Sequence, residues 1–263
     1  DWAWVTQKES KQRLAVYNDW LPHIHVDFHE QGIDNPYYFA PAAEPMHEVI
    51  TQWQRNFQVE IGKNHAKYFD ENGWFYFTKE VFDLLYPSYG DTYPIYSGSI
   101  GMTYEQGGSG RAGLGVKIDN GDTLTLKDRI THHYTTGLST IEMATKNAAE
   151  LNEEFSKFYS NKDYTYNSYV LSGDIDKLKM LTDLLDVHRI KYGFTKSKVK
   201  GLSYKSKKNE TLNSNSQKLV ISTNQPKSTL VTVLFEPETK LTDSLTYDIT
   251  AWALPYAYGL DAV

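Results

Sequence analysis

The chain contains no cysteine among its 263 residues. Without cysteine there can be no disulfide bond, no thiol nucleophile and no thiolate ligand for a metal ion. Long apolar runs are missing too, because no stretch reaches the roughly eighteen apolar residues that a membrane-spanning helix needs. The formal net charge is −6 and no basic stripe occurs. These features argue against a membrane span and against binding to nucleic acid.

Aromatic residues, in contrast, are abundant. They make up 14% of the chain, with 20 Tyr and 6 Trp, whereas the hydrophobic fraction of 40% and the charged fraction of 23% are ordinary for a globular protein. Surfaces rich in Tyr and Trp often bind peptides or sugars, although the same residues also fill hydrophobic cores. The length allows one large domain or two smaller ones.

Two units are expected along the chain. The composition changes after Tyr159, and the polar stretch 160–163 predicts a boundary. We therefore expect one unit at 1–160 and a small α/β module at 163–263.

The strand predictions place two polar side chains at the ends of apolar segments. Residues 23–29 alternate polar and apolar, which predicts a strand with one buried face that ends at His29. Residues 100–104 predict a second strand that ends just before Glu105. Asn120-Gly121 lies between two short alternating runs and predicts a hairpin. In the second unit, strands are expected at 169–171 and 217–223, the first followed by a helix with Asp174 as its N-cap.

Three helices are expected in the first unit from apolar residues at helical spacing. The first spans about 44–69, the second about 78–85, and the third about 139–158. In the third, Ser139 and Glu142 have the spacing of a capping box. Loops are expected at 30–45, 86–98 and 196–216, where Gly, Pro, Asn, Lys and Tyr concentrate.

His29 and Glu105 are the first candidates for chemistry. Each follows an apolar strand at the point where the chain turns into a polar or glycine-rich segment, so each side chain is expected at a sheet edge over open space. A single histidine or glutamate at such a position is more often a surface or structural residue than a functional one. His25 lies on the same strand face as His29, and only this alternation could bring the two near one ion.

The order of these segments resembles the zinc metallocarboxypeptidases related to carboxypeptidase A. The resemblance is carried by Val26-Asp27-Phe28-His29-Glu30, by a helix, by a Tyr-rich Gly/Pro loop, by Met102-Thr103-Tyr104-Glu105 and by a long closing helix. It covers about residues 1–160. It implies a partial carboxypeptidase-type mixed β-sheet flanked by helices, and hydrolysis of peptide bonds by zinc-activated water.

The resemblance also assigns roles to particular residues. His29 matches the family's third zinc ligand, and Glu105 matches its general base. A loop tyrosine of the family closes on the substrate, and Tyr89 is the best match, with Tyr86 and Tyr93 as rivals.

Two further residues are weaker candidates for the site. Asp27, on the face of His29, could orient that ligand, although a structural role is about equally expected. Arg111 could bind a substrate carboxylate, although an exposed, solvated arginine is the more common situation.

Other parts of the family pattern are missing from the sequence. The family's first two zinc ligands come as His-x-x-Glu, and no such spacing occurs between Asp1 and His29. After Glu105, Gln106-Gly107-Gly108 stands where the family has Leu-Arg. One histidine cannot hold a catalytic zinc ion, which needs three protein ligands. We therefore expect a fragment of a longer protein, inactive unless the missing part of the catalytic domain is supplied.

Residues 163–263 resemble the glutamine-amidotransferase-like module that follows the catalytic domain in some bacterial members of the family. The segments 230–237 and 244–252 carry this similarity. Because the amidotransferase nucleophile is a cysteine and none is present, the module is expected to be structural or to bind a ligand. Family habit implies a bacterial protein that is periplasmic or secreted.

Three functions are compatible with the sequence. The leading one is a metallocarboxypeptidase-like hydrolase acting on peptides. The second is an amidase or deacylase on the same scaffold, acting on a non-peptide acyl bond or on a peptidoglycan-like substrate. The third is a catalytically dead protein that binds peptide or glycan.

Overall fold

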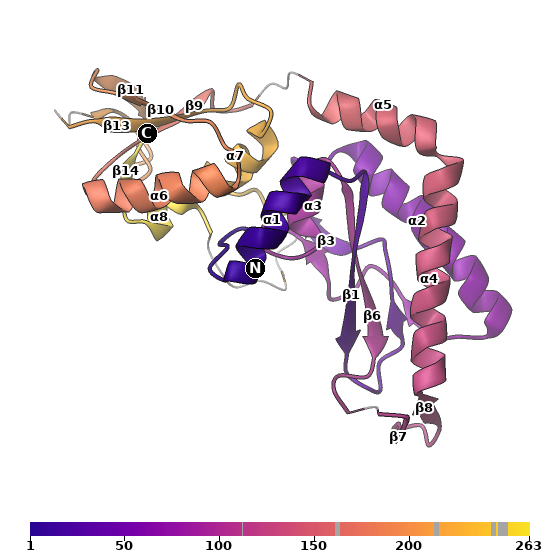
Figure 1. Cartoon of the computed structure of the whole chain (residues 1–263). Coiled ribbons are helices and arrows are strands. Elements are labelled where there is room, and N and C mark those ends of the chain that lie inside the picture. The colour runs from indigo at the N-terminus through magenta and orange to yellow at the C-terminus, as the bar shows by residue number, and fades with distance from the viewer. Residues whose placement is uncertain (112, 161–163, 213–215, 243–245, 247–251) are drawn as a thin grey trace.

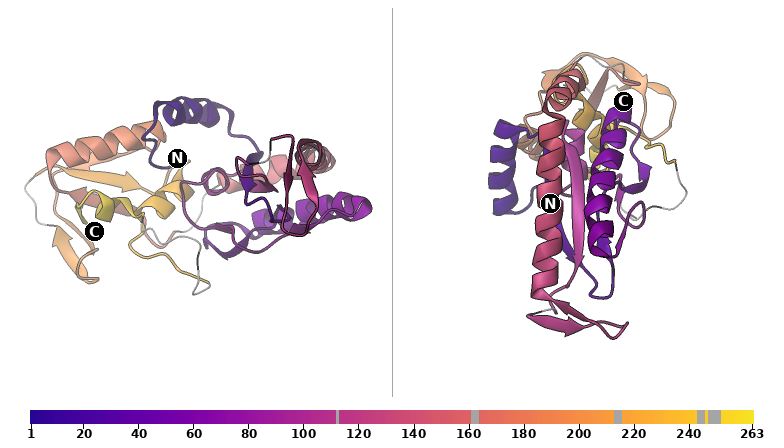
Figure 2. Two further views of the ribbon diagram at one scale, coloured as in Figure 1. Left: turned by 90° about the horizontal axis from the view of Figure 1, so that it is seen from below. Right: turned by 90° about the vertical axis from the view of Figure 1, so that its right-hand side faces the viewer.

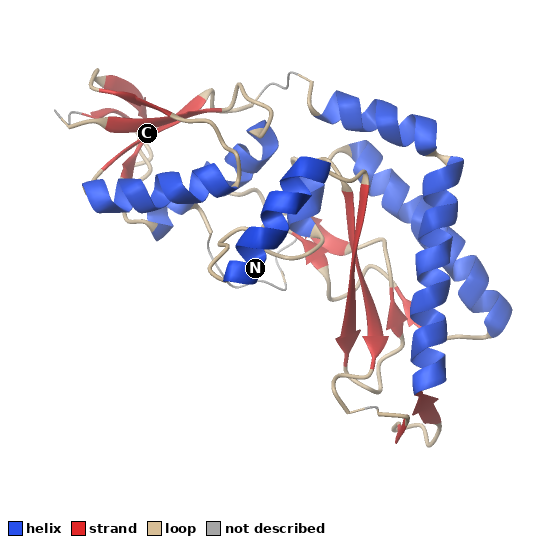
Figure 3. Cartoon of the chain, viewed as in Figure 1, coloured by secondary structure: helices blue, strands red, loops and turns tan. Residues whose placement is uncertain are grey.

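The structure, a computed structural model, describes residues 1–111, 113–160, 164–212, 216–242, 246 and 252–263. It has a mixed α/β architecture, as the sequence predicts (Figures 1 and 3). The helices are α1 (Lys8–Trp20), α2 (Gln52–Asn72), α3 (Thr92–Tyr96), α4 (Leu126–Lys146), α5 (Ala148–Phe158), α6 (Ile175–Val187), α7 (Ser228–Phe235) and α8 (Leu254–Ala257). In the described residues, no helix is both long and apolar enough to cross a membrane.

Two four-stranded sheets organise the chain. The first has the order β1-β6-β2-β4 and the second the order β10-β13-β9-β14. The first is formed by β1 (Ile24–Gln31), β2 (Tyr37–Tyr38), β4 (Tyr76–Phe77) and β6 (Ile100–Gly107), and the second by β9 (Ser168–Ser172), β10 (Gly193–Thr195), β13 (Lys218–Ser222) and β14 (Asp261–Ala262). Three two-stranded pairs complete the set: β3 (Ala43–Met46) with β5 (Asp83–Leu84), β7 (Gly115–Lys117) with β8 (Thr123–Thr125), and β11 (Val199–Leu202) with β12 (Asn209–Leu212).

The first sheet is mixed, because β1 runs parallel to β6 while β2 runs antiparallel to it. One of its faces is covered by α2, α4 and α5 and forms a hydrophobic cluster that includes Met102 and Tyr104 of β6, Ile61 of α2 and Leu151 of α5. The side chains of β6 alternate between the two faces. Thr103 and Glu105 therefore point away from this core, and the opposite face of the sheet is left for the site.

Buried polar side chains hold α2 against the sheet. Gln54 donates hydrogen bonds to the carbonyl oxygens of Ile95 and Ser99, and Gln58 donates to that of Gly101. These contacts satisfy buried backbone acceptors in α3 and at the start of β6. They thus fix the position of the strand that carries Glu105.

The second sheet is antiparallel throughout. It lies with α6 at one end of the molecule, whereas the β7–β8 hairpin lies at the other (Figures 1 and 2). One hydrophobic cluster nevertheless joins the C-terminal elements to the first half of the chain, because Trp2, Tyr17 and Tyr93 pack in the same group as Leu181 and Leu234. The C-terminal elements therefore share a core with α1 and α3.

The strands predicted at 23–29, 100–104, 169–171 and 217–223 are present, as are the hairpin at Asn120-Gly121 and the Asp174 cap, whose carboxylate accepts from two backbone N–H groups of α6. Several expected loops contain regular structure. The segment 30–45 includes β2 and most of β3, the segment 86–98 includes α3, and the segment 196–216 includes β11 and β12. Segment 230–237 lies largely in α7, and most of 244–252 falls outside the described residues.

One helix prediction in the first half was wrong, and another placed the start of its helix too early. The helix expected from about residue 44 begins at Gln52, because Thr51 and Gln54 form a capping box and the preceding residues pair as β3. The helix expected at 78–85 does not form. Its last residues make β5, which runs parallel to β3, so strand pairing overrides the local helical spacing.

The predicted helix at 139–158 has different limits. It begins at Leu126, where Thr125 and Asp128 form the capping box. Ser139 lies inside α4, where its hydroxyl contacts His65 Nδ1 at 2.7 Å. The helix is interrupted at Asn147, and α5 continues from Ala148. The apolar periodicity was therefore real, but it marked only the second half of a longer element.

Two surfaces of this first half remain open among the described residues. β1 is an edge strand of its sheet. Along one flank of α4 lie exposed apolar side chains at helical spacing, and Phe28 of β1 is exposed beside Gly137 of the same helix. The exposed residues of α4 are Leu126, Ile130, Tyr134, Leu138 and Ile141. In the described part of the chain, the sheet therefore ends in a strand edge that is open for pairing, and α4 carries an exposed apolar surface.

Candidate functional site

The pairing of β1 with β6 places His29 beside Glu105. The two strands are parallel and in register, so Asp27 lies opposite Thr103 and His29 lies opposite Glu105. Positions two residues apart share a face of a strand. All four side chains therefore project from the face of the sheet that α2 and α4 do not cover.

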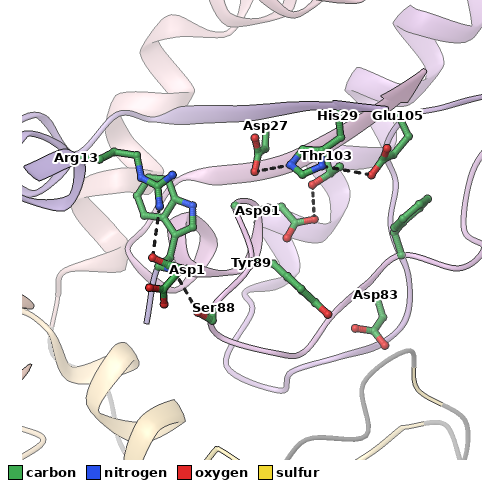
Figure 4. A pocket seen from close by; sticks show the side chains of 13 residues that line it. Asp1, Arg13, Asp27, His29, Asp83, Ser88, Tyr89, Asp91, Thr103 and Glu105 are labelled. Carbon is green, nitrogen blue, oxygen red and sulfur yellow. Dashed lines mark hydrogen bonds and ion pairs between the residues drawn. The ribbon is translucent and has the colours of Figure 1, made fainter. Parts of the chain in front are cut away.

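These side chains line a cavity of about 450 Å³ (Figure 4). Arg13 and Asp1 lie at one end of it and Glu105 at the other, with Tyr89 and Asp83 on a third side (Figure 4). The lining residues are Asp1, Trp2, Arg13, Asp27, His29, Phe82, Asp83, Ser88, Tyr89, Gly90, Asp91, Thr103 and Glu105. The cavity thus combines several carboxylates with one guanidinium group, one imidazole and aromatic walls.

His29 is placed between two carboxylates. Its Nε2 atom lies 3.1 Å from Asp27 Oδ2, and its Nδ1 atom lies 3.9 Å from Glu105 Oε1. The hydrogen bond to Asp27 raises the pKa of His29 above its ordinary value, although partial burial opposes this, and the charges of Asp27, Glu105 and Asp91 add to it. For Asp27, burial is the largest single effect and acts to raise the pKa, but the hydrogen bond to His29 and the charges of His29, His25 and Arg13 together outweigh it, so the pKa is lowered. The pair therefore favours an ionised Asp27 that orients the imidazole.

Glu105 is a buried acid of the site, with 6% of its surface exposed. Its Oε2 atom is buried and has no hydrogen-bond partner among the described residues. Burial raises the pKa of Glu105 to about 7; the positive charge of His29 opposes the shift, and Asp27 and Asp91 add to it. A carboxyl group with a pKa near neutrality and an unpaired oxygen can accept a proton from water near pH 7.

Asp91 forms a second buried acid next to this pair. Its carboxylate accepts hydrogen bonds from Thr103 Oγ1 at 2.9 Å and from the backbone N–H of Thr92 at 2.7 Å. Burial raises the pKa of Asp91 to about 6, although these hydrogen bonds oppose it. Two glycines allow the loop of Asp91 to lie close to β1 and β6. A Cβ atom on Gly90 would lie 1.7 Å from Asp27 Oδ2, and one on Gly101 would lie 1.9 Å from the carbonyl oxygen of Asp91.

The three candidate tyrosines lie in different surroundings. Tyr89 lines the cavity and is 37% exposed. Tyr86 is partly buried and its hydroxyl accepts from Trp4 Nε1, whereas Tyr93 is fully buried and contacts His188 Nδ1 at 2.8 Å. Of the three, Tyr89 is thus the one that both borders the cavity and reaches solvent.

The structure does not bring Arg111 to the cavity. Arg111 lies exposed in the turn after β6, where its backbone N–H donates to the carbonyl oxygen of Gly108. Arg13 of α1 lines the cavity instead, with its guanidinium carbon 4.1 Å from the centre of the Trp2 ring. Neither Arg13 nor Asp91 was predicted from the sequence as a site residue. Only the Gly90-Asp91 pair carried a signal, because a glycine beside an acid permits close packing of backbone.

A catalytic zinc site needs three protein ligands and one open position. In the described parts of the chain, no group of three or more His, Asp or Glu side chains has the geometry to hold a metal ion. His29 supplies one imidazole, and both of its ring nitrogens already face carboxylates. The described residues do not by themselves complete a zinc site.

Comparison with protein-family models, with curated proteins and with solved structures gives no match to this chain. The resemblance to the zinc metallocarboxypeptidases therefore stays a prediction. The functional argument has to come from the geometry of the cavity itself.

Proposed function

We propose that the chain carries the general-base side of a metallocarboxypeptidase-like hydrolytic site that acts on peptide bonds. The observation that supports this proposal is the buried Glu105 carboxylate, which has an unpaired oxygen in a cavity and stands beside His29 on a paired strand. A buried, unpaired acceptor is costly unless a ligand or water satisfies it. Water in the cavity that reaches the Glu105 carboxylate would be placed for deprotonation.

The chemistry that we assign to Glu105 is proton transfer. With its pKa raised to about 7, the carboxylate can take a proton from water at neutral pH and return it to the leaving amine. Tyr89 would donate a hydrogen bond to the substrate from the rim of the cavity. Arg13, rather than Arg111, would bind a substrate carboxylate, because it is the arginine that lines the cavity.

His29 is proposed as one zinc ligand, with Asp27 fixing the orientation of its ring. Bound zinc would supply Lewis-acid polarisation of the scissile carbonyl. The remaining ligands would come from residues other than those described. The open edge of β1 gives a second polypeptide segment a place to pair beside His29, and the exposed apolar flank of α4, on the other face of the sheet, gives the same segment apolar surface to pack on. A periplasmic or secreted location belongs to the same proposal.

The C-terminal module is proposed to support the site rather than to catalyse. The rings of Trp252 and Tyr86 meet edge to face with their centres 5.9 Å apart, and those of Tyr86 and Tyr89 meet in the same way at 5.1 Å. His188 of the module contacts Tyr93 in the same loop region. Contacts from the C-terminal module would therefore stabilise the position of the loop that carries Tyr89.

Two alternatives remain open on the same geometry. An amidase or deacylase would use the same base, and cleavage of a peptide with a free carboxyl terminus but not of its amide would separate a carboxypeptidase from it. A catalytically dead peptide- or glycan-binding protein would keep the aromatic walls without needing Glu105 as a base.

A site-resolved zinc titration tests the proposal without requiring turnover. The imidazole resonances of the eight histidines would be followed by NMR while Zn²⁺ is added to the millimolar range. We expect His29 to respond first, and we expect this response to disappear in His29→Ala and to weaken in Asp27→Asn. If other histidines respond and His29 does not, His29 is not a metal ligand and the binding-protein alternative is favoured.

A further inference from the structure

Glu105 borders two cavities. The first is the site described above, and the second, of about 560 Å³, lies on the other side of the Glu105 carboxylate. Glu105 and Phe82 line both. The other residues of the second cavity are Glu30, Gln31, Asn35, Pro36, Phe77, Glu80 and Val81. A ligand whose reacting bond lies at Glu105 can therefore extend in two directions.

We propose that this second cavity is a subsite for the acyl-side residue of an extended peptide, and that it prefers a bulky apolar side chain. The inference rests on the proposed function, because it takes Glu105 to mark the position of the scissile bond. Arg13 is the one guanidinium group on the walls of the first cavity, so the carboxyl-terminal end of a peptide belongs there. The acyl side of the same peptide then enters the second cavity.

The apolar wall of the subsite comes from Val81 and Phe77. Val81 is 55% exposed, and its backbone has φ of +66°, a left-handed conformation that β-branched residues rarely adopt. The backbone N–H of Phe82 donates to the carbonyl oxygen of Glu80 at 2.7 Å, so Val81 is the central residue of a three-residue turn with positive φ. Such strained residues cluster at ligand-binding sites.

Several other polar groups of the subsite already take part in hydrogen bonds or an ion pair. Gln31 Nε2 donates to the carbonyl oxygen of Pro36 at 2.7 Å, and Asn35 Nδ2 donates to Gln31 Oε1 at 3.2 Å. Glu30 forms an ion pair with Arg129 at 3.1 Å. The exposed Glu80 adds negative charge beside Val81. An apolar side chain is thus favoured in the subsite and an acidic one is repelled.

Binding of matched N-acetylated dipeptides tests the subsite. The probes are acetyl-Phe-Phe, acetyl-Gly-Phe and acetyl-Glu-Phe, each with a free carboxyl terminus, and the readout is the dissociation constant from NMR shifts of His29 and Glu105. We expect acetyl-Phe-Phe to bind about 10-fold more tightly than acetyl-Gly-Phe, because one aromatic side chain leaves water. Acetyl-Glu-Phe should bind most weakly.

Two variants and one control make the test specific. Val81→Asn suits the positive φ and removes the apolar branches, so it should take away most of the preference for Phe over Gly. Glu80→Lys should strengthen the binding of acetyl-Glu-Phe severalfold. Val16→Asn makes the same side-chain change on the exposed surface of α1 and should alter nothing.

Three outcomes are distinguishable. A preference for Phe that Val81→Asn removes supports the subsite. If all three dipeptides shift His29 and Glu105 with equal affinity and neither variant matters, the subsite is wrong while the proposed function stands. If no dipeptide perturbs His29 or Glu105, the proposed function fails and the subsite fails with it.

Discussion

His29 and Glu105 occupy paired positions on the parallel strands β1 and β6, and His29 Nδ1 lies 3.9 Å from Glu105 Oε1. The pairing makes the two groups electrostatically dependent. The charge on His29 lowers the pKa of Glu105 against the effect of burial, and the charge on Glu105 raises the pKa of His29. A change at either residue should therefore be detected at the other.

Replacing Glu105 by Gln should stabilise the protein at alkaline pH. The pKa of Glu105 is about 7 in the folded protein against an ordinary value of 4.5. The folded state therefore binds this proton more tightly than the unfolded chain does, and it loses stability as pH rises from 4.5 through about 7. Glu105→Gln removes that loss, so the free energy of unfolding should rise by roughly 2 kcal/mol at pH 8.

Urea unfolding at pH 4, where Glu105 is protonated in both states, and at pH 8 measures this effect. Little difference between the variant and the native protein is expected at pH 4. The exposed Glu210 of β12 provides the control, because Glu210→Gln should change stability little at either pH. A Glu105→Gln variant that is equally destabilised at both pH values would contradict a raised pKa at this position.

Replacing Asp27 by Asn should lower the pKa of His29. The hydrogen bond from the His29 ring to Asp27 is the largest cause of its raised pKa, and an amide does not stabilise the imidazolium ion in the same way. NMR titration of the His29 ring should give a midpoint at lower pH in Asp27→Asn. Asp19→Asn, which removes a surface carboxylate paired with Arg189, should leave the midpoint unchanged. An unaltered His29 titration in Asp27→Asn would mean that Asp27 does not orient the ring.

Replacing Gly90 by Ala should disturb the same pair through packing. The added Cβ would lie 1.7 Å from Asp27 Oδ2 and 2.5 Å from Asp27 Cγ, so Asp27 must move away. We expect a loss of roughly 1 to 3 kcal/mol in the free energy of unfolding, together with a lower pKa for His29. Gly193→Ala is the matched control, because no atom lies within 4 Å of its added Cβ. If both variants behave alike, the close approach at Gly90 has no role.

Local sequence patterns were sufficient for the strands that carry His29 and Glu105, although both strands continue two residues beyond these positions, to Gln31 and Gly107. The register that joins them was not predictable, because it depends on contacts between residues more than seventy positions apart. Arg13 and Asp91 reach the cavity from a helix and from a loop, and neither has a pattern of its own. The helix expected from about residue 44 was placed too early, because Thr51 and Gln54 form its capping box and the helix begins at Gln52.

The most direct test of the account is a ¹³C NMR titration of the Glu105 carboxyl group in the native protein and in His29→Asn. The account predicts a midpoint near pH 7 in the native protein and a higher one in the variant, because the positive charge that opposes the raised pKa is lost. A midpoint near 4.5 that is the same in both proteins would contradict it. Glu105 would then be an ordinary carboxylate whose pKa is neither raised by burial nor affected by the charge of His29.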